Sequence, residues 1–243
     1  MSFMAKIAAG AATFALAGGG LGLAGTLSAS AATPSCGWQC SNWYTQKFDQ
    51  AFVLDVLHGQ ASTGNGGILF QASNSDPAED FVTTDLGSVS DLYGQHHHGH
   101  AISRGYDISP GFANAYGHNP AIEIRYEPLG RDSKLCIGTW PGQNAQAGFK
   151  IRLETCGQTN TLFVKPAHHG GHASNRPDSY IPLIAGTNTN FSTPLVLNYP
   201  AGHPTDMPRP CLNVEPLSTY SQHHSIYDSQ LWADQEGVLN NQS

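Results

Sequence analysis

The sequence predicts an all-β domain, either a barrel or a sandwich, because short apolar runs alternate with turn-rich connections and charged residues are scarce. Charged residues make up 12% of the chain, which also contains 27 glycines and 15 prolines. This composition favours strands and loops over long surface helices. Several runs alternate apolar and polar residues, the period of half-buried strands. The runs expected to form strands are 52–56, 68–70, 121–126, 149–153, 161–164 and 194–197.

The amino-terminal segment has the three parts of a secretory signal peptide. Lys6 gives a weakly basic start, residues 7–27 form an uncharged and largely apolar run, and small residues follow as far as Ala31. We expect cleavage after Ala31, which separates a signal of residues 1–31 from a single exported domain of residues 32–243. The alternative is a membrane-spanning helix, since a span needs about 20 apolar residues. Six glycines within the run make it a poor anchor.

The exported part is acidic. Of the 11 Lys and Arg residues of the chain, Lys6 leaves with the signal, so ten face 18 acidic residues. The basic residues are few and unclustered, so the chain lacks the electrostatic footprint of a nucleic-acid binder or of a protein that docks on an anionic membrane. No second long apolar run occurs. We therefore expect a secreted, extracellular protein that binds neither nucleic acid nor, after cleavage, a membrane.

Three segments of the exported part share one plan, which consists of a short strand, a turn-rich gap, usually a second strand and an aromatic close. The repeat cores are expected at about 52–82, 135–164 and 210–233. Two insertions, roughly 85–120 and 165–205, are expected to loop out of the repeats. Loops of that length within one domain usually carry function or argue against the assignment.

The repeats resemble the ricin-B type β-trefoil, a lectin-like domain in which three repeats pack around a pseudo-threefold axis. The resemblance depends on the spacing of Cys136 and Cys156 and on the closing motif Gln230-Leu231-Trp232, which only one repeat keeps. It implies a β-trefoil with three degenerate repeats, and a β-sandwich is the alternative. Segments 69–81 and 183–190 also resemble secreted actinobacterial proteins, a likeness that carries no chemistry.

The five cysteines all lie in the exported part, where disulfides form. Their spacings do not resemble a zinc finger. The family resemblance implies a disulfide between Cys136 and Cys156. We further expect a tight loop closed by Cys36 and Cys40, which leaves Cys211 unpaired.

In the resembled family, a galactose-type site combines an Asp on the first strand, an aromatic ring and an amide-bearing rim. An ionised carboxylate has enough acceptor sites for two adjacent sugar hydroxyls. Carried over to this chain, the Asp is Asp55, the ring is Phe70, Asn65 precedes the second strand, and Glu79 lies at the rim. The resemblance therefore implies a sugar site formed by these four residues.

The other two repeats do not repeat this set. They carry Gly138 and Asn213 at the positions expected to match Asp55, so at most one such sugar site is expected. The alternative interpretation of Asp55 is a carboxylate that stabilises a turn after an edge strand.

Histidines are the next candidates, because the chain has 12 and most of them fall in three clusters. Imidazole binds zinc, copper and nickel, and His-rich tracts bind metal on composition alone. The candidate ligands are His96, His98, His100, His168 and His172. A structured site also needs converging geometry and supporting partners, so solvated His-rich loops are the preferred interpretation and no cofactor is expected.

Catalysis has weaker support. The chain lacks a G-x-S-x-G elbow, an H-E-x-x-H helix and a Cys/His protease signature. Asp76, Glu79 and Asp80 include two carboxylates that would suit a glycosidic bond, although a polar loop explains them more simply.

The leading prediction is a secreted, non-catalytic carbohydrate-binding module with a site around Asp55 and Phe70. One alternative is a secreted structural or interaction protein that keeps a trefoil scaffold and has lost its sugar pocket. Another is a His-rich metal-binding protein.

Overall fold

The computed structural model describes most of residues 40–236. The described residues are 40–45, 47–48, 51–73, 76–97, 106–141, 144–165, 182–184, 193–200, 202–218 and 227–236. The expected signal of residues 1–31 lies outside them. Among the described residues, no helix is long and apolar enough to cross a membrane.

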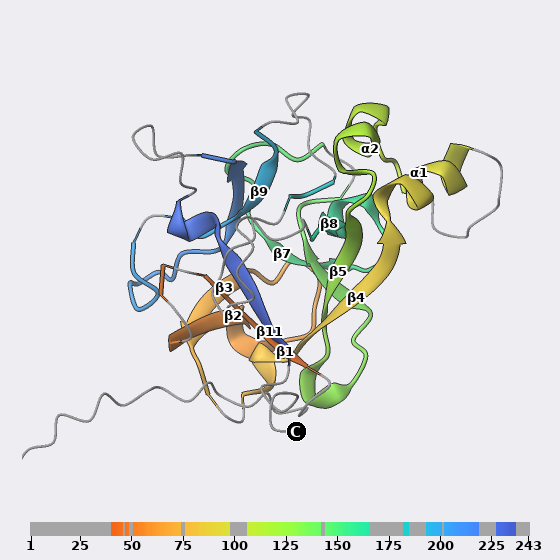
Figure 1. The fold of residues 1–243 in the computed structure, drawn as a ribbon. Coiled ribbons are helices and arrows are strands. Elements are labelled where there is room, and N and C mark those ends of the chain that lie inside the picture. The colour runs from red at the N-terminus through yellow and green to blue at the C-terminus, as the bar shows by residue number, and fades with distance from the viewer. Residues whose placement is uncertain are drawn as a thin grey trace, which may run out of the picture.

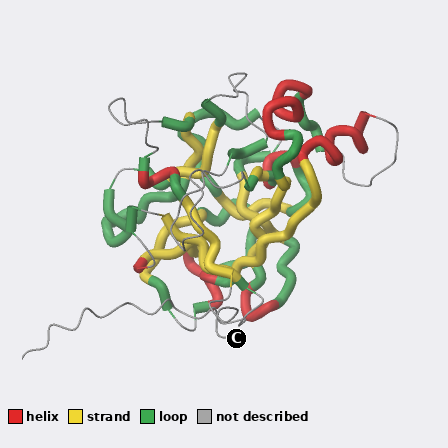
Figure 2. The backbone as a smooth tube through the Cα atoms, viewed as in Figure 1, coloured by secondary structure: helices red, strands yellow, loops and turns green. Residues whose placement is uncertain are grey.

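Short strands dominate the described part of the chain, with two α-helices and several 3-10 turns (Figure 2). The strands are β1 (Ser41–Thr45), β2 (Phe52–Val56), β3 (Gly67–Gln71), β4 (Phe81–Ser88), β5 (Pro120–Tyr126), β6 (Leu135–Gly138), β7 (Arg152–Thr155), β8 (Phe163–Val164), β9 (Leu195–Asn198), β10 (Asn213–Pro216) and β11 (Trp232–Glu236). The α-helices are α1 (Val89–His97) and α2 (Pro110–Tyr116). Every run that the sequence predicts as a strand overlaps one, although β7 shares only Arg152 and Leu153 with the predicted run 149–153.

Three antiparallel hairpins repeat the same geometry. They are β2–β3, β6–β7 and β9–β10. Each hairpin is followed by a short 3-10 helix, η4 (Pro77–Glu79), η6 (Thr159–Thr161) or η7 (Asp228–Gln230). An aromatic residue then stands at or next to the start of the closing strand, namely Phe81, Phe163 or Trp232, and each of these rings is almost fully buried.

A closed ring of backbone hydrogen bonds joins the three hairpins. The N–H of Gly67 donates to the carbonyl of Ile151 (3.0 Å), that of Ile151 to Leu212 (2.8 Å), and that of Leu212 to Gly67 (2.8 Å). Each residue donates to the next and accepts from the previous one. This cyclic pattern marks a pseudo-threefold axis.

The remaining strands form a barrel beneath the hairpins. Pairing runs from β11 to β1, from β1 to β4, from β4 to β5 and from β5 to β8, and an isolated bridge between Phe163 and Leu183 extends it (Figure 1). Barrel strands closed by three hairpins around a threefold axis make a β-trefoil. The all-β trefoil prediction is therefore confirmed, and the β-sandwich alternative is not what the chain forms.

The third repeat begins earlier than the sequence predicts. Its hairpin is β9–β10, so its first hairpin strand lies inside the stretch 165–205 that was expected to be an insertion. Cys211 lies two residues before the second strand of that hairpin, at the position that Gly66 and Lys150 hold in the other two. The error arose because Cys211-Leu212-Asn213-Val214 matches the first-strand motif of the family, whereas β9 carries no such motif.

The first insertion, 85–120, is not a plain loop. It contains α1 and α2, which pack through Val89, Leu92 and Phe112 against the barrel residue Val164 in a second apolar cluster. The helices lie together at one end of the molecule (Figure 2). Ser109 caps the N-terminus of α2, because its hydroxyl accepts a hydrogen bond from the N–H of Phe112 (3.2 Å).

The cysteines follow the expected pairing as far as the structure describes them. Cys136 and Cys156 form a disulfide that joins the two strands of the second hairpin at its open end. Cys40 is also disulfide-bonded, and Cys36 lies outside the described residues. Cys211 is a free, half-buried thiol.

Candidate functional site

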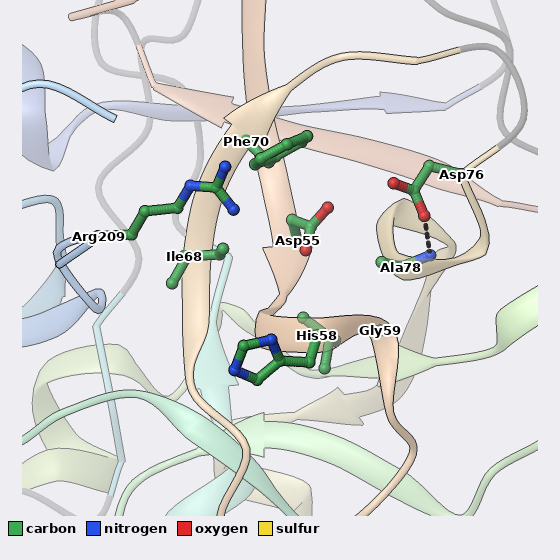
Figure 3. A pocket seen from close by; sticks show the side chains of 9 residues that line it. Asp55, His58, Gly59, Ile68, Phe70, Asp76, Ala78 and Arg209 are labelled. Carbon is green, nitrogen blue, oxygen red and sulfur yellow. Dashed lines mark hydrogen bonds between the residues drawn. The ribbon is translucent and has the colours of Figure 1, made fainter. Parts of the chain in front are cut away.

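A cavity of about 250 Å³ opens beside the first hairpin (Figure 3). Its lining comes from both hairpin strands, from the segments that follow them and from the third repeat. The lining residues are Asp55, Val56, His58, Gly59, Ile68, Phe70, Asp76, Ala78 and Arg209.

Asp55 is placed in this cavity by the alternation of β2. Its neighbours Leu54 and Val56 belong to the central apolar cluster, so Asp55 points to the opposite face of the strand. The residue is only 4% exposed, and its carboxylate accepts no hydrogen bond from any described residue. Burial raises the pKa of Asp55 to about 7; the charge of Asp76 adds to this rise and that of Arg209 opposes it.

Two more carboxylates lie next to Asp55. Asp76 precedes η4, and its Oδ1 accepts a hydrogen bond from the N–H of Ala78 (2.9 Å), as Figure 3 shows. Glu79 is fully buried at the end of η4. One oxygen of each of the three carboxylates lies within 4.8 Å of the other two. Once ionised, the three carboxylates concentrate negative charge at the inner wall of the cavity.

Glu79 also has a structural role that the sequence interpretation missed. Both of its carboxylate oxygens accept from the N–H of Ser73 at 3.1 Å. In the third repeat, Gln230 makes the equivalent bond, accepting from the N–H of Ser218 at 2.9 Å. Burial raises the pKa of Glu79 to about 8, the Ser73 hydrogen bond opposes this rise, and the charge of Asp55 adds to it. Glu79 is behind the cavity wall rather than on the sugar-facing rim, which corrects its expected place.

Arg209 forms the wall opposite the carboxylates. Its guanidinium carbon lies 4.1 Å from the centroid of the Phe70 ring, a cation–π contact. Its Nε is buried without a hydrogen-bond partner among the described residues, and no ion pair within 4.0 Å joins it to a described carboxylate. Phe70 lines the cavity, and Arg209 covers one face of its ring. This part of the cavity wall is therefore a guanidinium stacked on a ring rather than a bare aromatic face.

The outer edge of the cavity is formed by a sharp turn. His58 and Gly59 both adopt left-handed backbone angles, with φ of 65° and 61°. This region is uncommon for a non-glycine residue such as His58. The hydroxyl of Tyr126 donates to the carbonyl of Gly59 (3.2 Å) and ties the turn to β5. The exposed imidazole of His58 is thereby held at the mouth of the cavity.

Two of the four predicted sugar-site residues do not line the cavity. Asn65 lies in the hairpin turn, where its side chain donates to the carbonyl of Gln60 (2.6 Å). Glu79 is behind the wall, as described above. Asp55 and Phe70 both line the cavity. Sequence reasoning missed Arg209, because it comes from the third repeat and no motif links it to the first hairpin.

The pseudo-threefold axis identifies the counterparts of Asp55. Asp55 pairs with Ile68, Gly138 with Arg152, and Asn198 with Asn213. The counterparts are therefore Gly138 and Asn198, which corrects the expected Asn213 to its hairpin partner.

Neither counterpart lines an equivalent charged site. A Cβ on Gly138 would lie 2.5 Å from the carbonyl oxygen of Asn160, so the space there is filled. Asn198 donates to Asn213 (2.8 Å) and accepts from Ser229 (3.1 Å). The trefoil fold thus accepts a glycine or a neutral amide at this position and does not require a carboxylate.

The candidate histidine ligands and the candidate catalytic residue Asp80 have less structural support than the Asp55 cavity. His98, His100, His168 and His172 lie outside the described residues, and the side chain of His96 is not described. Asp80 accepts a hydrogen bond from the N–H of Leu129 (2.8 Å), which gives it a structural role.

No protein-family model matches the chain, and no curated protein matches its sequence. Similar solved structures include a designed 3-fold symmetric protein, ThreeFoil, which is 12% identical over 80% of this chain and 96% of its own, with a TM-score of 0.46. An SDF2-like protein from Arabidopsis thaliana is 9% identical over 82% of this chain and 93% of its own, with a TM-score of 0.42. The trefoil assignment depends on the hydrogen-bond ring and the three hairpins of this chain itself.

Proposed function

We propose that the chain is an exported, non-catalytic carbohydrate-binding module whose site is the cavity at Asp55. One observation carries the proposal. Asp55 is 4% exposed, has no hydrogen-bond donor among the described residues, and lines an open cavity. Burying an unpartnered carboxylate destabilises a protein, and the counterparts Gly138 and Asn198 indicate that the fold does not need it. A ligand that donates hydrogen bonds accounts for its presence.

Sugar hydroxyls suit a cavity that has the carboxyl of Asp55 on one side and the guanidinium of Arg209 on the other. A hydroxyl both donates and accepts, so a pair of adjacent hydroxyls is able to donate to Asp55 and accept from Arg209. The cavity, at about 250 Å³, is smaller than the roughly 300–1,000 Å³ of pockets for drug-sized ligands. We therefore expect one monosaccharide unit to enter, with galactose-type sugars tested first because of the resemblance described above.

The proposal includes export. The signal-like segment 1–31 supports it, and the Cys136–Cys156 disulfide is compatible with an oxidising compartment.

The rival interpretation, a trefoil scaffold that has lost its pocket, predicts a flat or filled surface near Asp55. The cavity favours a retained site instead. Metal capture by the histidine clusters stays a prediction, since those side chains are outside the described residues.

The test is a glycan array followed by calorimetric titration of the best ligand. Asp55→Ala and Arg209→Ala are expected to weaken binding at least about tenfold, since each removes a charged hydrogen-bonding group. The control is Trp140→Ala, which removes a half-exposed ring outside the cavity that is stacked on Arg152. Absence of any glycan ligand, or full affinity in Asp55→Ala, contradicts the proposal. Release of a reducing sugar would indicate hydrolysis rather than simple binding.

A further inference from the structure

We propose that Asp55, Asp76 and Glu79 together hold a calcium ion at the inner wall of the cavity. The inference goes beyond carbohydrate binding and does not depend on it, because the ion would be held by the carboxylates of the chain.

The spacing of the three carboxylates suits one ion. Ca²⁺ binds oxygen ligands at about 2.3–2.6 Å, so two oxygens on opposite sides of the ion lie about 4.8 Å apart. One oxygen each of Asp55, Asp76 and Glu79 falls within 4.8 Å of the others. Ca²⁺ also tolerates irregular coordination, whereas Mg²⁺ demands near-ideal octahedral geometry at about 2.0–2.1 Å.

Asp76 and Glu79 both keep acceptor capacity that a cation is able to use. Asp76 uses Oδ1 for the N–H of Ala78, which leaves Oδ2 available. The oxygens of Glu79 share the single N–H of Ser73, so each keeps acceptor capacity. Asp80, the next carboxylate along the chain, instead accepts from the N–H of Leu129.

Asp55 supplies an observation independent of the spacing. It is a buried carboxylate without a hydrogen-bond partner among the described residues, and it lines the cavity. The neighbouring cation, Arg209, makes no ion pair with it, because the guanidinium is stacked on Phe70. No described cation forms an ion pair with the three carboxylates, so once they are ionised a bound divalent cation would compensate their charge.

The decisive experiment is calorimetric titration of tag-free, EDTA-treated protein with CaCl₂ at pH 8, and with MgCl₂ in parallel. We expect one Ca²⁺ per chain and much weaker Mg²⁺ binding. Ca²⁺ is the probe because it prefers oxygen ligands, so the histidine clusters do not compete for it.

Variants locate the ion. Asp55→Asn and Asp76→Asn keep the shape of the side chain and remove its charge, and each is expected to weaken Ca²⁺ binding at least about tenfold, since affinity follows the charge of the ligands. Asn is also a good cap, so η4 is expected to persist in Asp76→Asn. Asp85→Asn changes an exposed carboxylate on β4 and should bind Ca²⁺ like the wild type. Far-ultraviolet circular dichroism checks the fold of each variant.

The outcomes separate the two proposals. No saturable Ca²⁺ binding at millimolar concentration, or wild-type affinity in Asp55→Asn, overturns the ion site. Sugar binding that persists in EDTA without any Ca²⁺ binding overturns the ion site and leaves the carbohydrate proposal intact. Ca²⁺ binding without any glycan ligand supports the ion site and overturns the carbohydrate proposal.

Discussion

Replacing Asp55 by Asn is expected to stabilise the protein at alkaline pH. The pKa of this buried carboxyl rises from 3.8 to about 7 in the folded chain. At about 1.4 kcal/mol per pKa unit, the rise corresponds to roughly 4 kcal/mol of destabilisation once Asp55 is ionised. An amide of the same shape avoids the cost of burying a charge.

The sign of the pH dependence follows from proton binding. Between pH 3.8 and about 7, the folded state keeps a proton on Asp55 that the unfolded state has lost. The free energy of unfolding of the wild type therefore falls as pH rises through this window. Glu79 acts in the same direction between pH 4.5 and about 8. Asp55→Asn removes the pH dependence that comes from Asp55 and leaves part of the pH dependence that comes from Glu79.

The assay is urea unfolding of wild type and Asp55→Asn at pH 4.5, 6.5 and 8 in EDTA, which removes divalent cations. The advantage of the variant should grow with pH and approach a few kcal/mol at pH 8. Asp85→Asn, at an exposed position, should match the wild type throughout. An advantage for Asp55→Asn that is the same at pH 4.5 and pH 8, or no advantage at pH 8, would refute the reasoning.

Two further predictions concern the scaffold. Gln230→Ala should lower the free energy of unfolding by about 1–3 kcal/mol in urea titrations, because it removes the acceptor of the N–H of Ser218 and one of the two donors to the carbonyl of Pro216; an unchanged midpoint would contradict the role given to this side chain. Thiol titration of denatured, unreduced protein should find one free thiol per chain, from Cys211; three thiols would contradict the expected Cys36–Cys40 pairing.

The fold was predictable where the residues of a sequence motif also make the hydrogen bonds, core contacts or disulfide that hold a repeat together. Gln230-Leu231-Trp232 was recognisable because Gln230 closes its hairpin and Trp232 fills the core while its Nε1 donates to Leu197 (3.0 Å). The Cys136–Cys156 spacing corresponds to the two paired strands that the disulfide joins. The start of the third repeat was not predictable in this way, because β9 has the apolar composition of any buried strand and only its pairing with β10 identifies it.

The candidate site was predictable only in part. Asp55 and Phe70 lie on the strands of one hairpin, so a local pattern places them together. Arg209 reaches Phe70 from the third repeat, a contact that depends on the closed threefold arrangement and leaves no periodicity in the sequence. Glu79 was misplaced because its hydrogen bond to Ser73 turns it behind the cavity wall, which a one-dimensional alignment with the family does not show.

The most direct test of the account is a crystal structure of the wild-type protein with its best array glycan. The account predicts a sugar ring in the cavity beside Phe70 and Arg209, with hydroxyl oxygens within hydrogen-bonding distance of the Asp55 carboxylate. A glycan bound elsewhere, for example on the exposed ring of Trp140, with the Asp55 cavity free of sugar, would contradict it.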